Sequence, residues 1–228
     1  MAYSPPRVHV GPRDWDNAAA TDYWLNANSL SGQTSAASAT NPYGLSGWGW
    51  TTTSLTVVAG GTGDLNSSGD VDPVAFGTDA ANDALVSPKL FGGYDQFQRV
   101  ADILGYSPTI LRAVMYARFS TIGANENTTG FGFMTGTDFT AAGSVAGIIS
   151  DNTNFLLKSD NGSDSGAAKD TNWHKFQIDV GGTNTEWFID GTSQGTITTE
   201  TDIYPTRFKL IAGTTNRVQL SWLHILYV

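Results

Sequence analysis

The sequence predicts an all-β protein built as an antiparallel β-sandwich. After Pro108 the chain is a succession of short apolar segments separated by turn signals such as Asp160-Asn161-Gly162 and Asp190-Gly191, the rhythm of a sandwich or barrel. Charged residues make up only 14% of the 228 residues, and the Gly, Ala, Ser, Thr and Asn that replace them favour turns and sheet edges over long helices. No fixed-period repeat is present, which argues against a propeller or solenoid.

The predicted elements follow in chain order. Residues 1–45 are expected to form an irregular N-terminal arm of loops, since prolines interrupt them and no periodicity is visible. The sandwich is expected over 46–228. One short helix is predicted over Tyr94–Leu104, with Gly105 as its cap. A strand or hairpin is expected over 47–50 and 54–58, and strands are expected at 111–119, 131–134, 147–149, 155–158, 175–180, 185–189, 207–211 and 218–228.

The segment Trp173–Gly191 predicts a central hairpin. Phe176, Ile178 and Val180 share one face of a strand, because strand side chains alternate. The Gly181-Gly182-Thr183-Asn184 turn supplies residues that tolerate positive φ, and the return strand is apolar on both faces. Aromatic residues usually anchor sandwich cores, so we expect Trp173, Trp187 and Phe188 to be structural. His174, on the face of Phe176, is expected to be hydrogen-bonded at the rim of the core.

This hairpin resembles a signature of the concanavalin A-like lectin/glucanase superfamily, including its laminin G-like members. The likeness lies in Trp173-His174 opening a strand, in Phe188-Ile189-Asp190-Gly191, and in the closing strand Val218–Val228. It covers the chain from about Ile110 onward and implies a jelly-roll β-sandwich. It implies little about activity, since this fold carries enzymes, lectins and structural modules. Some members are phage structural proteins, so the resemblance is compatible with a phage virion component.

Charge and composition exclude several classes of function. The net charge is −9 and the twelve Lys and Arg residues are scattered, so we expect no nucleic-acid partner. No segment reaches the roughly 20 apolar residues of a membrane helix, and the N-terminus does not resemble a Sec signal. We therefore expect a soluble protein that is not in a membrane. The sequence has no cysteine, which favours a bacterial or viral protein made in a cytoplasm.

The sequence predicts that the protein is not an enzyme and has no catalytic residues. Glucanases of the superfamily carry Glu-x-Asp-x-x-Glu on one strand, and none of Glu126, Glu186 and Glu200 begins that pattern. A lyase of this fold would need a Tyr, His and Arg or Lys constellation. The available candidates are Arg112, Tyr116, Arg118 and His174.

Two candidate binding sites stand out before Pro108. The first imitates a calcium loop, with Asp64, Asn66, Ser68 and Asp70 at alternate positions. Its twelfth position is Ala75 instead of a bidentate carboxylate, so a polar surface loop is favoured over weak calcium binding, and no other cofactor is expected. The second is carbohydrate-binding: Trp48 and Trp50 would project from one side of a strand, with Tyr43 nearby. They could stack on a sugar, although burial in the core or an interface is favoured.

Three functions remain open. The first is a structural protein of a phage virion, either a capsid decoration or a tail-associated protein, made in the host cytoplasm. It would contact other virion subunits and form a homo-oligomer, with a trimer as the arrangement that decoration modules suggest. The second is a carbohydrate-binding module with glycans as partners, which is compatible with the first. The third, which the sequence favours least, is a glycan hydrolase or lyase.

Overall fold

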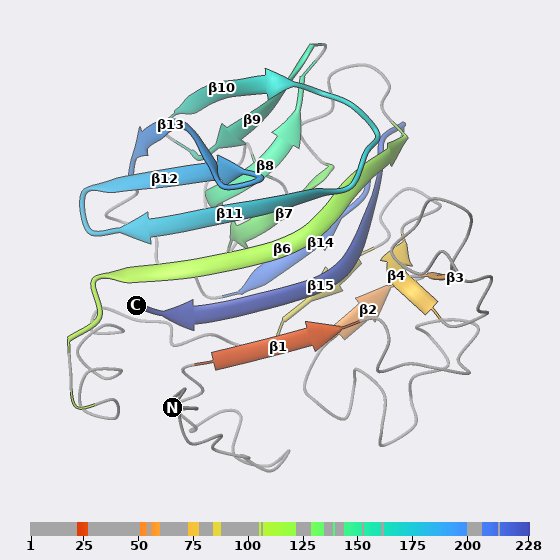
Figure 1. Ribbon diagram of the computed structural model, residues 1–228, viewed down its shortest axis with the longest axis horizontal. Helices are drawn as coiled ribbons and strands as arrows, with labels where there is room; N and C mark the ends of the chain where they lie inside the picture. The colour runs from red at the N-terminus through yellow and green to blue at the C-terminus, as the bar shows by residue number, and fades with distance from the viewer. Residues whose placement is uncertain are drawn as a thin grey trace.

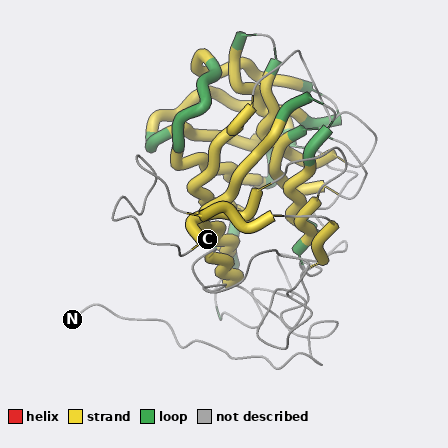
Figure 2. Tube along the Cα trace, turned by 90° about the vertical axis from the view of Figure 1, so that its right-hand side faces the viewer, coloured by secondary structure: helices red, strands yellow, loops and turns green. Residues whose placement is uncertain are grey.

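The described part of the chain is built from β-strands and the loops between them. The computed structural model describes residues 22–26, 51–53, 56–59, 73–77, 84–87, 105, 107–121, 129–134, 139, 144–151, 153–160, 162–199, 207–213 and 215–228. Within these ranges no helix occurs, and Figure 2 shows strand and loop throughout. None of the described segments is a helix long and apolar enough to cross a membrane. The predicted helix Tyr94–Leu104 lies outside the described residues.

The first sheet, here called sheet A, has eight strands and faces the viewer in Figure 1. Its spatial order is β13-β12-β11-β6-β15-β4-β3, with β1 also paired to β15. The strands are β1 (Asp22–Asn26), β3 (Thr56–Ala59), β4 (Pro73–Gly77), β6 (Ile110–Thr121), β11 (His174–Gly181), β12 (Asn184–Ile189), β13 (Thr192–Thr198) and β15 (Arg217–Tyr227).

The second sheet, sheet B, has seven strands in the order β10-β9-β8-β7-β14-β5-β2. They are β2 (Thr51–Thr53), β5 (Ala84–Val86), β7 (Gly130–Met134), β8 (Ser144–Ser150), β9 (Asn154–Lys158), β10 (Ser163–Ala168) and β14 (Phe208–Ile211). All pairings within both sheets are antiparallel. The predicted all-β antiparallel sandwich is therefore confirmed.

The two longest strands, β6 and β15, lie side by side in sheet A. The other edge of β15 is shared: Gln219 and Leu220 pair with β4, and residues 222–226 pair with β1. The strand β1 falls within residues 1–45, which the sequence predicts as an arm. The arm–sandwich boundary at 45/46 stays a prediction, because most of that range lies outside the described residues.

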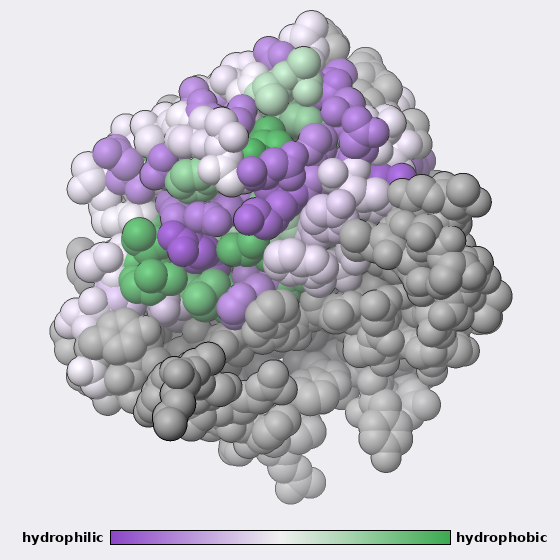
Figure 3. All heavy atoms as spheres, in the orientation of Figure 1, coloured by the Kyte–Doolittle hydropathy of each residue, from purple (hydrophilic) through white to green (hydrophobic). Residues whose placement is uncertain are grey.

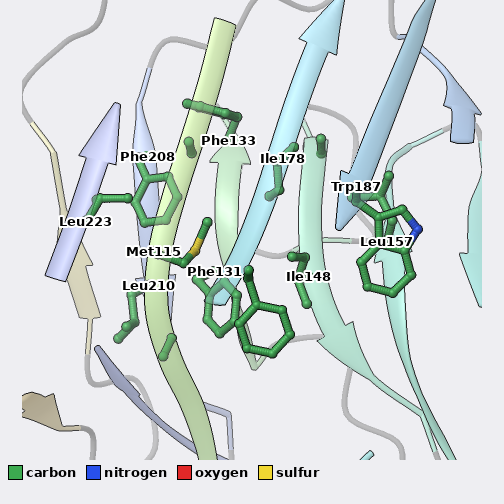
Figure 4. Packing of buried hydrophobic residues seen from close by; sticks show 14 of the residues in the cluster. Met115, Phe131, Phe133, Ile148, Leu157, Ile178, Trp187, Phe208, Leu210 and Leu223 are labelled. Carbon is green, nitrogen blue, oxygen red and sulfur yellow. The ribbon is translucent and has the colours of Figure 1, made fainter. Parts of the chain in front are cut away.

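The core fills the space between the two sheets. Side chains from alternate positions of both layers interdigitate there (Figure 4), including Met115, Ile178 and Trp187 from sheet A and Phe131, Ile148 and Phe208 from sheet B. Phe119, Phe131, Phe155 and Phe176 form a chain of tilted and edge-on ring contacts. Buried apolar area is the main source of stability in such a fold, and the predicted burial of Trp187 is confirmed, since it has no exposed surface.

The two sheets are joined by side-chain hydrogen bonds where β10 of sheet B meets β13 and β12 of sheet A. The Trp187 indole N–H donates to Asp164 Oδ2 at 2.9 Å, and the Ala167 N–H donates to Gln194 Oε1 at 2.8 Å. Close packing here requires glycine. A Cβ added to Gly166 would lie 2.6 Å from the Trp187 ring, and one added to Gly195 would lie 2.1 Å from Asp164 Oδ2.

The two turns of the hairpin differ from the sequence prediction in one respect. The Gly181–Asn184 turn tolerates positive φ, but among the described residues positive φ occurs at Asp190 (51°) and Gly191 (84°), in the next turn, as well as at Gly105 and Gly195. Two successive residues with positive φ are the mark of a type I′ turn, whose twist matches that of the flanking strands. The β12–β13 connection is therefore the tight turn that fixes strand register here.

Candidate functional site

The outer faces of the two sheets differ in character. On sheet B, Met134, Phe139 and Ile149 form a second buried apolar cluster, with Leu156 and Ile211 packed against it. Phe139 lies over Gly147, where an added Cβ would meet its ring. On sheet A the outward positions of the middle strands are mostly half-buried and largely polar or aromatic. Figure 3 shows this face, with hydrophilic side chains across its middle and hydrophobic patches between them.

Strand register arranges the outer face of sheet A in rows. Because side chains alternate, Arg112, Val114, Tyr116 and Arg118 of β6 all point away from the core. On one side of β6, Lys175 pairs with Tyr116, Gln177 with Val114 and Asp179 with Arg112. On the other side, β15 places Trp222 beside Tyr116 and Gln219 beside Arg118.

The centre of this face is a group of four side chains, which we call the aromatic patch: Tyr116, Arg118, Trp173 and Gln219. The rings of Tyr116 and Trp173 are stacked, with centroids 5.5 Å apart and planes 5° apart. The Arg118 guanidinium carbon lies 4.8 Å from the centroid of the Trp173 ring, and Arg118 Nε donates to Gln219 Oε1 at 2.7 Å. The patch therefore brings two half-buried aromatic rings together with guanidinium and amide groups, which can donate to or accept from hydroxyls.

Next to the aromatic patch, the charges of Arg112 and Asp179 cancel. Arg112 Nε and Nη2 donate to the two Asp179 carboxylate oxygens at 2.8 and 2.6 Å, the fork geometry that suits arginine and carboxylate. Gln177 Nε2 donates to the same carboxylate at 3.0 Å. The hydrogen bonds to Asp179 raise the pKa of Arg112, which stays charged. The pair contributes polar groups to the face without adding net charge.

His174 lies on the inner side of its strand, at the rim of the core, as predicted. Its ring meets Phe155 and Phe176 edge-on. Both ring nitrogens face carboxylates: Nδ1 is 2.6 Å from Asp190 Oδ2, and Nε2 is 3.0 Å from Asp170 Oδ1. Burial lowers the pKa of His174, but the hydrogen bonds with Asp190 and Asp170 outweigh it, so the net shift is upward.

The four residues weighed for a lyase site do not converge. Arg112, Tyr116 and Arg118 point out of sheet A, whereas His174 packs inward against Phe155 and Phe176. Of the acids near the hairpin, Asp179 is paired with Arg112, and Glu186 Oε1 accepts from Ser193 Oγ at 2.7 Å. These contacts give the named residues structural partners, and they do not assemble into the acid–base set that was considered.

The expectation that Trp173 and Phe188 belong to the core is wrong. Both are half-buried and lie on the outer face of sheet A. The strand parity carries the signal that could have shown this: Trp173 alternates in phase with Lys175, Gln177 and Asp179, the polar face, and out of phase with Phe176. Tyr116, Arg118 and Gln219 complete the aromatic patch through register between strands distant in sequence, which the sequence pattern alone does not give.

The binding sites predicted before Pro108 lie outside the described residues. This applies to the carbohydrate-binding candidates Tyr43, Trp48 and Trp50, and to the calcium candidates Asp64, Asn66, Ser68 and Asp70. Both sites stay predictions. In the part of the chain that the structure describes, no three His, Asp or Glu side chains are grouped so that they could hold a metal ion.

Comparisons with known proteins relate the chain to others by fold. No family model matches the sequence, and no curated protein matches it at a significant level. Among solved structures, it is similar to a carbohydrate esterase from the Shiga toxin-encoding bacteriophage phi24B, with 16% identity, 82% of this chain and 94% of that chain covered, and a TM-score of 0.50. It is also similar to Trypanosoma rangeli sialidase in complex with difluorosialic acid, with 11% identity, 75% of this chain and 27% of that chain covered, and a TM-score of 0.51.

At these identities the likeness shows a shared fold. The chain spans about a quarter of the sialidase (27%) and nearly all of the phage esterase (94%). The predicted concanavalin A-like jelly roll is thus confirmed at the level of an antiparallel β-sandwich shared with glycan-active proteins.

The comparisons contradict the prediction that the protein is not an enzyme. Two of the solved structures with the shared fold are a carbohydrate esterase and a sialidase, both enzymes. The missing Glu-x-Asp-x-x-Glu motif argues against one kind of glycosidase site only, and other chemistries do not require it. The absence of this motif therefore does not show the absence of an enzymatic activity.

Proposed function

We propose that this chain is a glycan-binding β-sandwich of a phage virion component, and that the glycan binds at the aromatic patch of sheet A. The observation that carries the proposal is the stacked Trp173–Tyr116 pair with Arg118 and Gln219 beside it. Small-molecule sites commonly combine aromatic surface with a few well-placed polar groups. A sugar presents both an apolar ring face and hydroxyls, so it complements such a surface.

The charge of the protein favours a neutral glycan. The net charge is −9, which disfavours the approach of polyanionic glycans. On the outer face of sheet A, the positive charge of Arg112 is neutralised by Asp179. We therefore expect neutral hexose or N-acetylhexosamine chains to bind more tightly than sulfated or uronate-rich chains.

The placement in a virion rests on sequence properties together with a fold comparison. The chain has no cysteine and few charged residues, and the sandwich is shared with a bacteriophage carbohydrate esterase over nearly the whole of that chain. A capsid decoration or tail-associated protein of this kind would contact other virion subunits as a homo-oligomer. Mass spectrometry of gradient-purified phage particles should detect it at a fixed ratio to the major capsid protein, and its absence from them would contradict this part of the proposal.

A glycan array tests the binding site. Wild-type protein is expected to bind neutral oligosaccharides, and Tyr116→Ala and Trp173→Ala are each expected to weaken binding about tenfold, the loss of one stacked aromatic contact. Lys158→Ala, on β9 of the other sheet, is the matched surface control and should bind as wild type does. Array hits incubated with the protein and analysed by mass spectrometry then separate binding from turnover, because cleaved or deacylated products would identify an enzyme acting on the same glycan.

A further inference from the structure

The turn that carries Trp173 is linked to the His174 side chain through Asp170. Asp170 Oδ1 accepts from the Asn172 N–H at 2.7 Å and faces His174 Nε2 at 3.0 Å. The same Asp170 oxygen therefore contacts residues on both sides of Trp173, whose ring stacks on Tyr116. On the other side of the ring, Nδ1 meets Asp190 Oδ2 at 2.6 Å, and Asp190 Oδ1 accepts from the Lys175 N–H at 2.8 Å.

This arrangement needs a proton on each ring nitrogen. A neutral imidazole has one N–H and one lone pair, whereas an imidazolium donates from both nitrogens. If His174 were neutral, one nitrogen lone pair would face a carboxylate oxygen, which is repulsive. The longer contact, Nε2 to Asp170 at 3.0 Å, is the one that the neutral ring would give up, while Nδ1–H keeps the shorter contact to Asp190.

The surroundings of His174 favour the charged ring. Phe155 of β9 and Phe176 of β11 pack edge-on against it and carry no charge. Among the described residues, the charged groups that face it are Asp170 from its own turn and Asp190 from the β12–β13 turn, with Lys175 acting on Asp190. Two carboxylates, those of Asp170 and Asp190, therefore face the half-buried imidazolium of His174.

We propose that His174 is a positioning residue for the aromatic patch: its imidazolium fixes the 170–173 turn so that Trp173 stacks on Tyr116, and loss of its proton releases Trp173 and weakens glycan binding. The inference rests on the proposed function for its binding half, while the positioning of Trp173 can be measured without any glycan. The pKa of His174 is raised from its ordinary value of 6.5, so the release occurs above pH 6.5 rather than below it.

Fluorine NMR of protein labelled with fluorotryptophan tests the inference. The chain has seven tryptophans, and the Trp173 signal is assigned by its disappearance in Trp173→Phe. In wild type the Trp173 signal should shift with pH, with a midpoint above 6.5. His174→Gln should abolish that midpoint. Asp170→Asn, which keeps an acceptor for Asn172 but removes a charge, should move the midpoint to lower pH. His224→Gln is the matched control and should retain the wild-type midpoint.

The glycan array, read at about pH 5.5 and about pH 8.5, supplies the second readout. Wild-type binding to neutral oligosaccharides should fall about fivefold between these pH values, the factor expected for one net hydrogen bond, and binding by His174→Gln should not change between them. A Trp173 signal that titrates while no glycan binds at either pH would uphold the positioning role and overturn the proposed function. A wild-type Trp173 signal that does not change with pH, or that changes equally in His174→Gln, would overturn the inference.

Discussion

Arg112 and Asp179 lie opposite each other on β6 and β11 and share two hydrogen bonds of 2.8 and 2.6 Å. The Asp179 side chain is only 8% exposed, and that of Arg112 is 30% exposed. A carboxylate this buried depends on its partner, because an unpaired buried charge is costly.

Arg112→Ala should therefore lower the free energy of unfolding by about 2 kcal/mol, a value reduced from that of fully buried pairs because Arg112 is part-exposed. Arg112→Lys should recover little of it, since lysine lacks the planar fork. A double-mutant cycle with Asp179→Ala in urea denaturation measures the coupling. Additive effects of the two single variants would show that the pair contributes no coupling energy.

The stability of the fold should depend on pH through His174. Its folded pKa is raised, so its contribution is complete below 6.5 and is lost as pH rises through the folded value. Burial raises the pKa of Asp170 and Asp190, but hydrogen bonds outweigh it and lower both below 3.8. Their contribution is complete above 3.8 and is lost as pH falls through the folded values. His174, Asp170 and Asp190 therefore all contribute fully to stability between pH 3.8 and pH 6.5.

Removing the histidine tests this window directly. The carboxylates are 41% and 55% exposed, so solvent screening limits the effect to about 1 kcal/mol. Thermal denaturation of His174→Gln should show that loss relative to wild type at about pH 5.5, and a smaller difference at about pH 9. His224→Gln serves as the control. An equal deficit at both pH values would mean that His174 acts through packing alone.

Gly166 and Gly195 should not tolerate alanine. The Gly166 Cβ would lie 2.6 Å from two atoms of the Trp187 ring, which is fully buried and cannot move aside cheaply. Gly195 combines a contact of 2.1 Å to Asp164 Oδ2 with a φ of +148°, which is unfavourable for residues with a Cβ. Each change should cost about 2 kcal/mol in urea denaturation. Gly182→Ala, which meets nothing within 4 Å, should stay within about 0.5 kcal/mol of wild type.

The hydrogen bond between Trp187 and Asp164 can be separated from the burial of the ring. Trp187→Phe loses the indole N–H and leaves a void, for an expected cost of about 3 kcal/mol. Asp164→Asn keeps an acceptor for the indole and should cost less than about 1 kcal/mol. Calorimetric melting temperatures give the order. A larger loss from Asp164→Asn than from Trp187→Phe would contradict the assignment of Trp187 as the anchor of this edge.

The fold was predictable from local patterns, because alternation and turn residues are local properties. The strands around Phe131, Phe155, Phe176 and Val218 follow directly from apolar runs between turns. The strand β10, Ser163–Ala168, was missed, because it is an edge strand of small polar residues with no buried apolar face. Asp164 of this strand also accepts from the Trp187 indole across the sandwich, a contact that no local pattern encodes.

The candidate site was predictable only in part. Parity places Trp173 in phase with the polar face of the strand that follows it, so that one member of the aromatic patch was predictable from the sequence. Tyr116 and Gln219 join it only because β6 lies between β11 and β15, and pairings such as Arg112 with Asp179 connect positions 67 residues apart. Register between distant strands depends on the packing of the whole sandwich.

The central claim is that a glycan binds over Trp173 and Tyr116 on sheet A. The most direct measurement is the change in backbone and side-chain NMR signals when the best neutral oligosaccharide from the array is added to the labelled protein. The account predicts the largest changes at Tyr116, Arg118, Trp173 and Gln219, with little change on sheet B. Changes confined to other surfaces, such as the segment that carries Trp48 and Trp50, would contradict it, as would an array without any bound neutral glycan.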